Sequence, residues 1–192
     1  MRLRGKRVMK RVRGFTLLEL MITVAVGGLL LSMAVPALQS FTNNAKRSGA
    51  VNDFVSSMHL ARNTAITANS RVTICASSNA TNCQAVTWDK GWIVFVDPNS
   101  NQSVDLGETI ISVSNGFDRV SLRSGEFAAY IMYRPNGRAM NASVAGNSGQ
   151  FTVCDSRGAE HARVVIVELS GRPRLSDYQA DGQGPVCADP II

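Results

Sequence analysis

The sequence predicts an α+β protein in which one long amino-terminal helix packs on a head of antiparallel β-sheet. Three observations predict this fold class. An apolar run of helix length follows a basic leader, and apolar residues then continue at helical spacing to about residue 69. The rest of the chain alternates short β-branched or aromatic segments with turn residues, a pattern typical of antiparallel strands.

The leader, residues 1–14, is strongly basic. It holds seven basic residues and no acid: Arg2, Arg4, Lys6, Arg7, Lys10, Arg11 and Arg13. Basic residues beside a membrane helix stay on the cytoplasmic side, so the chain that follows the helix is expected to be exported.

The apolar run over residues 15–38 is long enough to cross a bilayer as a helix, which takes about 20 residues. One carboxylate, Glu19, interrupts this run. A lone acid in hydrocarbon costs roughly 2.5–3.5 kcal/mol, so Glu19 is expected to have a function. The alternative is an acid that lies at the membrane interface.

The helix is expected to continue over residues 39–69 as an exported amphipathic half. Apolar residues recur there near helical spacing: Phe41, Val51, Phe54, Val55, Met58, Ala61 and Ala65. Pro36, with Gly27 and Gly28 earlier in the run, indicates a kink or a locally unwound turn. Asn69 and Ser70 are expected to end the helix.

Seven strands are predicted in a globular head that covers residues 70–175. They span residues 71–76, 91–97, 109–114, 118–123, 128–134, 150–154 and 163–169. Residues 176–192 are expected to form a tail. Trp88 and Trp92 flank the most apolar strand and are expected in the core rather than on a surface that stacks nucleic-acid bases.

The net charge of +6 comes from the leader, because the chain without the seven basic residues carries −1. Global charge therefore indicates no nucleic-acid partner. The charge is nevertheless uneven along the head. Residues 119–174 hold eight arginines and four acids, whereas residues 89–118 hold five acids and one lysine.

Four cysteines suit an oxidising compartment: Cys75, Cys83, Cys154 and Cys187. None of them has Cys-x-x-Cys spacing, which disfavours zinc. Of the three possible pairings we favour Cys75 with Cys83, which closes a short loop, and Cys154 with Cys187, which ties down the tail.

The stretch Gly14-Phe15-Thr16-Leu17-Leu18-Glu19-Leu20 resembles the prepilin processing site of type IV pilins and type II secretion pseudopilins. The resemblance implies that a prepilin peptidase cuts between Gly14 and Phe15 and methylates the new amino terminus. It also implies that Glu19 neutralises an amino terminus, its own or a neighbour's, during filament assembly. The alternatives are an ordinary membrane anchor or a signal peptide, although a signal peptide is cut after its apolar region.

Motifs in the head resemble the group that contains pseudopilin H and the fimbrial T and U type minor pilins. They are Leu60-Ala61-Arg62-x-x-Ala65, Val72-Thr73-Ile74-Cys75, Trp88-Asp89-Lys90-Gly91-Trp92-Ile93-Val94-Phe95-Val96-Asp97, Asp105-x-Gly107-Glu108, Phe151-Thr152-Val153-Cys154 and Ser170-Gly171-Arg172-Pro173-Arg174. The resemblance implies a pilin-like fold. It also implies a single-pass subunit of the bacterial inner membrane with a periplasmic head, which then joins other pilins in a pilus or pseudopilus.

No pattern in the sequence indicates an enzyme, and no cofactor is expected. His59 and His161 are interpreted as structural or solvated. Residues 97–108 have the spacing of a calcium loop, but Gln102 stands where such a loop needs glycine and no helices flank it. A polar hairpin loop is the favoured interpretation, so no metal site is predicted.

The segment Gly171-Arg172-Pro173-Arg174 is the strongest candidate for a ligand site. Proline favours extended backbone, in which residues two apart point the same way. Arg172 and Arg174 are then expected to form a fork suited to consecutive phosphates, with added charge from Arg157 and Arg163. In fimbrial T type minor pilins a Gly-Arg-x-Arg motif is associated with DNA, so the resemblance implies non-specific DNA binding in natural transformation. The alternatives are a solvated turn, and an assembly-only subunit of a pilus or of a type II secretion system.

Overall fold

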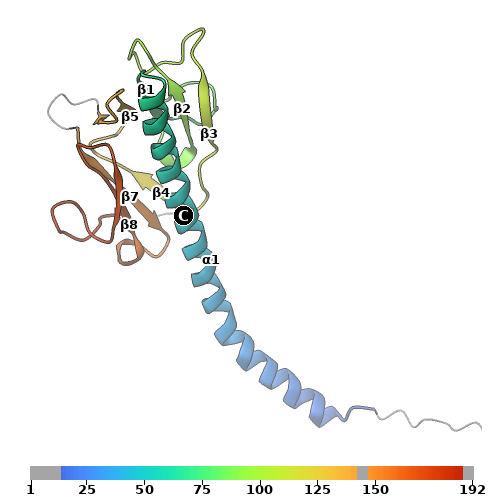
Figure 1. Cartoon of the computed structure of the whole chain (residues 1–192). Helices are drawn as coiled ribbons and strands as arrows, with labels where there is room; N and C mark the ends of the chain where they lie inside the picture. Colours follow the sequence, from blue (N-terminus) through green and yellow to red (C-terminus); the bar gives the residue numbers. More distant parts are fainter. Residues whose placement is uncertain (1–13, 142–146, 188–192) are drawn as a thin grey trace, which may run out of the picture. The chain divides into compact units, whose positions relative to one another are not determined.

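The computed structural model describes residues 14–141 and 147–187 (Figure 1). The chain divides into two compact units, residues 1–42 and residues 43–192. One helix, α1 (Leu17–Thr67), runs from the first unit into the second. Antiparallel strands follow it, so the fold is α+β as the sequence predicts.

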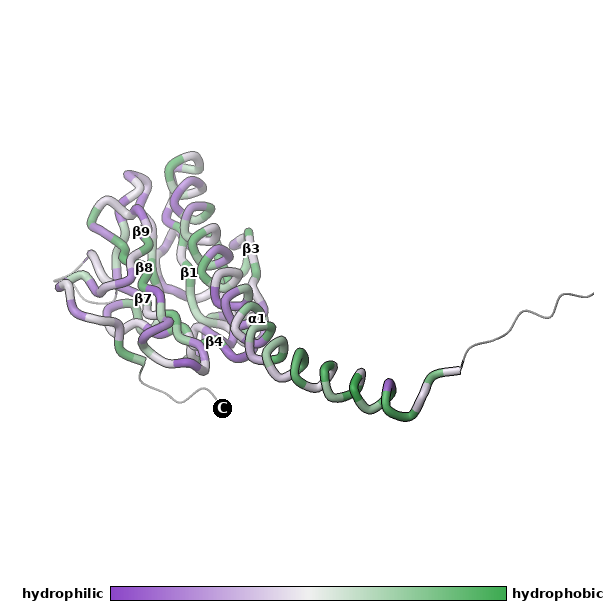
Figure 2. The backbone as a smooth tube through the Cα atoms, turned by 90° about the horizontal axis from the view of Figure 1, so that it is seen from below, coloured by the Kyte–Doolittle hydropathy of each residue, from purple (hydrophilic) through white to green (hydrophobic). Residues whose placement is uncertain are grey.

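Helix α1 is continuous from Leu17 to Thr67. The sequence had indicated a kink or a locally unwound turn at Pro36, but the helix is not unwound there. In the first unit its apolar side chains are exposed, and Figure 2 shows this stretch as mostly hydrophobic. Phe41, which we expected on the buried face, is also exposed. The buried face begins only at Arg47 and Ala50, where the helix starts to pack on the sheets.

Two antiparallel sheets make up the head. The first has the order β3-β2-β1-β5-β6, with β1 (Val72–Ala76), β2 (Trp92–Val96), β3 (Ile110–Ser114), β5 (Tyr130–Tyr133) and β6 (Ala139–Met140). The second has the order β4-β7-β8-β9, with β4 (Val120–Arg123), β7 (Gly149–Asp155), β8 (Arg163–Val167) and β9 (Pro173–Ser176). All seven predicted strands are present. Short 3-10 turns lie at Trp88–Lys90 and Ala159–His161.

Phe54 of α1 is the centre of the core. Its ring packs edge-on against Trp88, Trp92 of β2 and Phe151 of β7, with centroids 4.6–5.5 Å away. Both tryptophans are buried, as predicted, and each indole N–H has an acceptor. Trp88 donates to the carbonyl of Phe127, and Trp92 donates to a hydroxyl on α1. One helix residue therefore holds both sheets in a single core.

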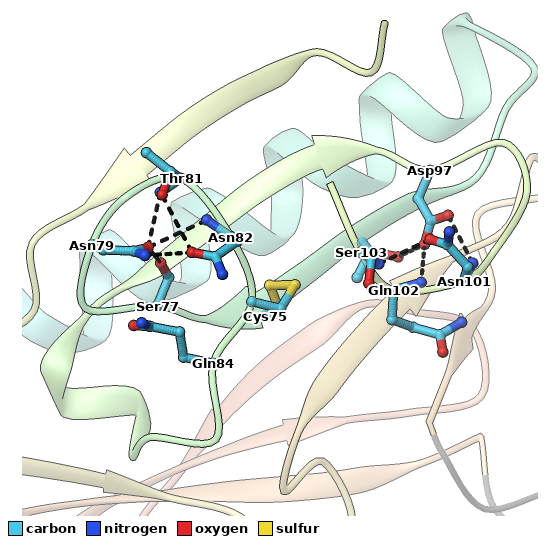
Figure 3. The surroundings of a disulfide bond; sticks show 12 residues. Cys75, Ser77, Asn79, Thr81, Asn82, Gln84, Asp97, Asn101, Gln102 and Ser103 are labelled. Carbon is cyan, nitrogen blue, oxygen red and sulfur yellow. Dashed lines mark hydrogen bonds between the residues drawn. A yellow bond between two sulfur atoms is a disulfide. The ribbon is translucent and has the colours of Figure 1, made fainter. Parts of the chain in front are cut away.

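Two disulfides fix the loops of the head. Cys75 is bonded to Cys83, and Cys154 is bonded to Cys187, which is the pairing that the sequence favoured. Figure 3 shows the first disulfide between two polar loops. The second ties the tail to β7 across 33 residues of sequence.

Candidate assembly segment and candidate nucleic-acid interface

The amino end of α1 is capped by Thr16. Its Oγ1 accepts a hydrogen bond from the backbone N–H of Glu19 at 3.2 Å, and its carbonyl accepts one from Leu20 at 3.1 Å. Thr16 and Glu19 thus have the spacing of a capping box. This role of Thr16 was not predicted, although the Thr-x-x-Glu spacing is readable from the sequence alone. The cap holds Glu19 in the first turn, where the helix dipole favours a carboxylate.

The side chains that follow Glu19 form a long exposed apolar surface. Helix α1 is the one helix in the described parts of the chain that is long and apolar enough to span a membrane. Leu29, Leu30 and Leu31 are about two-thirds exposed, so this surface is not confined to one stripe. A surface of this kind needs lipid or other apolar helices around it.

Gly171 joins the two sheets of the head. It lies in the turn between β8 and β9 with φ +74°. A Cβ added to it would lie 2.1 Å from the carbonyl oxygen of Gly137, in the turn between β5 and β6. Only glycine fits here, because the backbone is left-handed and the other turn approaches too closely. Its role in the motif is thus structural, and it places Arg172 beside the β5–β6 turn.

Arg172 and Arg174 are both exposed, but their surroundings differ. Arg174 Nε lies 3.4 Å from Glu168 Oε1, and the side chain lines a groove of about 860 Å³ that also holds Glu126 and Asp181. These acids offset the charge of Arg174, which makes it a weaker candidate for phosphate binding than Arg172. Within the described residues Arg172 has no ion pair.

Arg157 and Arg163, which were expected to add charge to a basic surface, each have an acid partner. Arg163 pairs with Asp177 at 2.5 Å. Arg157 makes a two-pronged contact with Asp155, with Nε at 3.0 Å and Nη2 at 2.6 Å. Asp177 reaches Arg163 through the pairing of β8 with β9, whereas Asp155 stands only two residues before Arg157 in the sequence.

Asp155 belongs to a buried cluster that joins α1 to the end of β7. Arg47 of α1 lies 3.7 Å from its carboxylate and donates to the carbonyl of His161. Burial alone would raise the pKa of Asp155, but hydrogen bonds from Arg157 and the charges of both arginines outweigh it, so this pKa lies below its usual value. Burial lowers the pKa of Arg47, and the neighbouring Arg163 lowers it further. The helical pattern placed Arg47 on a face other than the apolar one, so its burial was not predicted.

The loop over residues 97–108 is closed by its own hydrogen bonds. Asp97 is fully buried and accepts from Thr73 at 2.7 Å and from the backbone N–H groups of Asn101 and Gln102 (Figure 3). Asp105 accepts from two asparagine amides, at 2.7 and 2.8 Å. These hydrogen bonds close the loop between β2 and β3.

Family models match both units of the chain. The model described as type II transport protein GspH matches residues 50–171, and the model of the prokaryotic N-terminal methylation motif matches residues 9–35. The first match alone covers more than half of the chain. The chain belongs to the GspH family.

Solved structures agree with this assignment. Two crystal structures of the type IV minor pilin FimU from Pseudomonas aeruginosa are similar to this GspH family member. The first has a TM-score of 0.57 and 18% identity over 76% of this chain and 96% of that chain. The second has a TM-score of 0.51 and 16% identity over 72% of this chain and 96% of that chain. No curated protein matches the sequence. This member of the GspH family thus combines an amino-terminal methylation motif with the fold of the minor pilin FimU.

Proposed function

We propose that this chain is a minor pilin that enters a type IV pilus-like filament through its amino-terminal helix after removal of residues 1–14. A prepilin peptidase cuts between Gly14 and Phe15 and methylates Phe15. The helix is anchored in the inner membrane before assembly, with the head in the periplasm. The observation that carries this proposal is the exposed apolar surface of α1, which begins with one capped carboxylate, Glu19.

Cleavage places a free amine four residues before Glu19, at the end of α1 where Thr16 caps the helix. Two isolated charges are costly in an apolar environment, whereas a pair costs much less. Glu19 therefore gains a partner in the amine of its own chain or of a neighbouring subunit when the helix enters the filament.

Recovery of subunits in sheared filaments tests this role. Glu19→Gln keeps the shape of the side chain and removes its charge, and we expect at least a tenfold drop in incorporation at an unchanged membrane level. Glu160→Gln, on an exposed turn of the head, is the matched control and should incorporate normally. Normal incorporation of Glu19→Gln would refute the assembly role. Intact mass of both proteins should show loss of residues 1–14 and gain of one methyl group.

A second candidate function is non-specific DNA binding at Arg172, for uptake in natural transformation. The supporting observation is that Arg172 is exposed next to a tight turn and has no acid partner among the described residues. Guanidinium groups of this kind bind phosphate oxygens. Without DNA affinity, the chain is an assembly-only minor pilin or a type II secretion pseudopilin H.

The two arginines of the motif provide their own control. Arg172→Gln should weaken binding of a short DNA several-fold and reduce the dependence of affinity on salt. Arg174→Gln removes the same charge from a site that Glu168 already offsets, so its effect should be smaller. Equal binding of DNA by wild type and Arg172→Gln would show that Arg172 does not bind DNA.

A further inference from the structure

The register of the first sheet places three arginines in one row. Val72 of β1 pairs with Tyr133 of β5, and Tyr133 also pairs with Ala139 of β6. One residue further along these strands, Arg71, Arg134 and Arg138 follow in the same order. The backbone N–H of Arg134 donates to the carbonyl of Arg138 at 3.0 Å, so the pairing of β5 with β6 continues into this row.

The row lies on the outer face of the sheet. Val72, Tyr133 and Ala139 point into the core against α1, and side chains of successive rows alternate between faces. Residues 71, 134 and 138 therefore point away from α1. In agreement, the guanidinium of Arg134 contacts the sulfur of Met140 on that face, and Arg71 and Arg138 are exposed.

Neighbouring strands are only about 4.8 Å apart, and like charges at facing positions repel one another. An acid between them would relieve this repulsion, but none of the three arginines has an ion pair within the described residues. Asp97 of the adjacent β2 end is the nearest acid along the row, and its buried carboxylate is already held by Thr73 and loop N–H groups. The row thus holds an excess of positive charge.

A groove of about 410 Å³ opens beside this row. It is lined by two of the arginines and by uncharged side chains, with no carboxylate: Asn69, Ser70, Arg71, Pro98, Arg134, Pro135 and Asn136. Arg71 Nη1 donates to Ser100 Oγ at 2.8 Å, which orients its guanidinium. The groove therefore offers guanidinium and amide donors to an anion of phosphate size.

Further basic side chains lie at the turn that joins β5 to β6. Arg62 of α1 donates to the carbonyl of Gly137 at 3.1 Å, and Gly171 places Arg172 on the same turn. Arg62 reaches this turn from the α1 side and Arg172 follows the glycine that packs on it, so further cationic groups lie at the same end of the sheet as the row. This arrangement fits an extended chain of phosphates better than a single small anion.

We infer that Arg71, Arg134 and Arg138 form a phosphate-binding row that holds the backbone of a nucleic-acid strand. This inference deepens the proposed DNA function, on which its choice of ligand rests, and moves its centre from Arg172 to the first sheet. The contacts are to phosphates, so binding has no sequence preference.

The test compares three full-length proteins in the same neutral detergent, so that the basic leader is constant. They are the wild type, the row variant Arg71→Gln/Arg134→Gln/Arg138→Gln, and a control variant with the same change in charge, Lys46→Gln/Lys90→Gln/Arg119→Gln. Affinity for an oligo-dT strand and for inorganic polyphosphate is measured at several salt concentrations. Fluorescence of the two buried tryptophans verifies that each variant is folded.

The row variant should bind oligo-dT at least tenfold more weakly than the wild type. Its log–log salt slope should flatten by about two, at roughly 0.7 per phosphate contact on a single strand. The control should stay within twofold of the wild type. Equal binding by the row and control variants would overturn the inference, and loss in Arg172→Gln alone would then leave the DNA function standing without the row. Wild-type binding to polyphosphate but not to DNA, lost in the row variant, would keep the phosphate site and overturn the DNA function. Binding to neither would overturn both.

Discussion

Gly171 and Gly158 have the same kind of backbone but different surroundings. Both have positive φ, at +74° and +82°. A Cβ at Gly158 would meet nothing within 4 Å, whereas at Gly171 it would collide with the carbonyl oxygen of Gly137. The comparison separates the cost of left-handed backbone from the cost of steric overlap.

We expect Gly158→Ala to lower the free energy of unfolding by about 1–2 kcal/mol, which is the cost of left-handed backbone for alanine. Gly171→Ala should lower it by more than about 3 kcal/mol, because a carbonyl must also move. Urea unfolding followed by tryptophan fluorescence measures both. Similar losses for the two variants would show that the sheets do not approach at Gly171 as described.

The lowered pKa of Asp155 makes the stability of the head depend on pH. The carboxyl has a lower pKa when folded than when unfolded, so its contribution is complete above the unfolded value of about 4. The contribution is lost as the pH falls through the lower folded pKa. Acid should therefore weaken the junction between α1 and the end of β7.

Replacing Asp155 with Asn should cost about 3–5 kcal/mol at pH 7, because Arg47 stays buried without a counter-charge. The difference between wild type and variant should shrink as the pH is lowered below about 4. Unfolding curves at neutral and acidic pH measure this difference. A constant difference between pH 7 and pH 3 would contradict the role given to the carboxylate.

At the scale of elements, the two disulfides close loops of different length. Cys75–Cys83 spans 8 residues of sequence and Cys154–Cys187 spans 33. In the chain-entropy account a longer loop gives more stabilisation, about 2.5 kcal/mol for the first and about 3.7 kcal/mol for the second. The double variant Cys154→Ala/Cys187→Ala should therefore lose more stability than Cys75→Ala/Cys83→Ala.

Limited proteolysis distinguishes the two disulfide variants further. Loss of the Cys154–Cys187 bond should expose the segment after β9 to cleavage, while loss of the Cys75–Cys83 bond should expose residues 77–84. The reverse order of stability, or cleavage at neither segment, would contradict this account.

Strands were predicted correctly where the spacing of apolar residues and the residue composition both indicate a strand. The seven predicted strands are all found, since runs such as Trp92–Val96 are β-branched or aromatic throughout. Strand β6 has two residues and β9 begins with Pro173 at a sheet edge, so neither carries a strong local signal. On α1, Phe41 was expected to be buried and is exposed, whereas Arg47 was expected on another face and is buried, because a helical pattern alone does not reveal where the sheets begin.

Charged sites were harder to predict than strands. The local sequence singled out Arg172 and Arg174. Only the fold shows that Arg174 forms an ion pair with Glu168. The row of Arg71, Arg134 and Arg138 depends on strand register between segments about 60 residues apart, and no local pattern contains that information.

At the scale of the whole molecule, the proposed removal of the leader would reverse the sign of the net charge. The full chain carries +6, and removal of the seven basic residues of the leader leaves −1. A filament subunit is thus nearly neutral outside its local basic and acidic surfaces. Association of such subunits depends on the helix and on local contacts rather than on net charge.

The exposed helix also constrains the route into the filament. Fifteen large apolar side chains between Phe15 and Phe41 are at least half exposed. At roughly 1.5–3 kcal/mol each, their transfer from hydrocarbon to water would cost on the order of 20–45 kcal/mol. A subunit cannot cross that barrier by diffusing free in water between membrane and filament. In the proposed assembly it would therefore move from lipid onto neighbouring helices in one continuous step, which requires the growing end of the filament to stay at the bilayer.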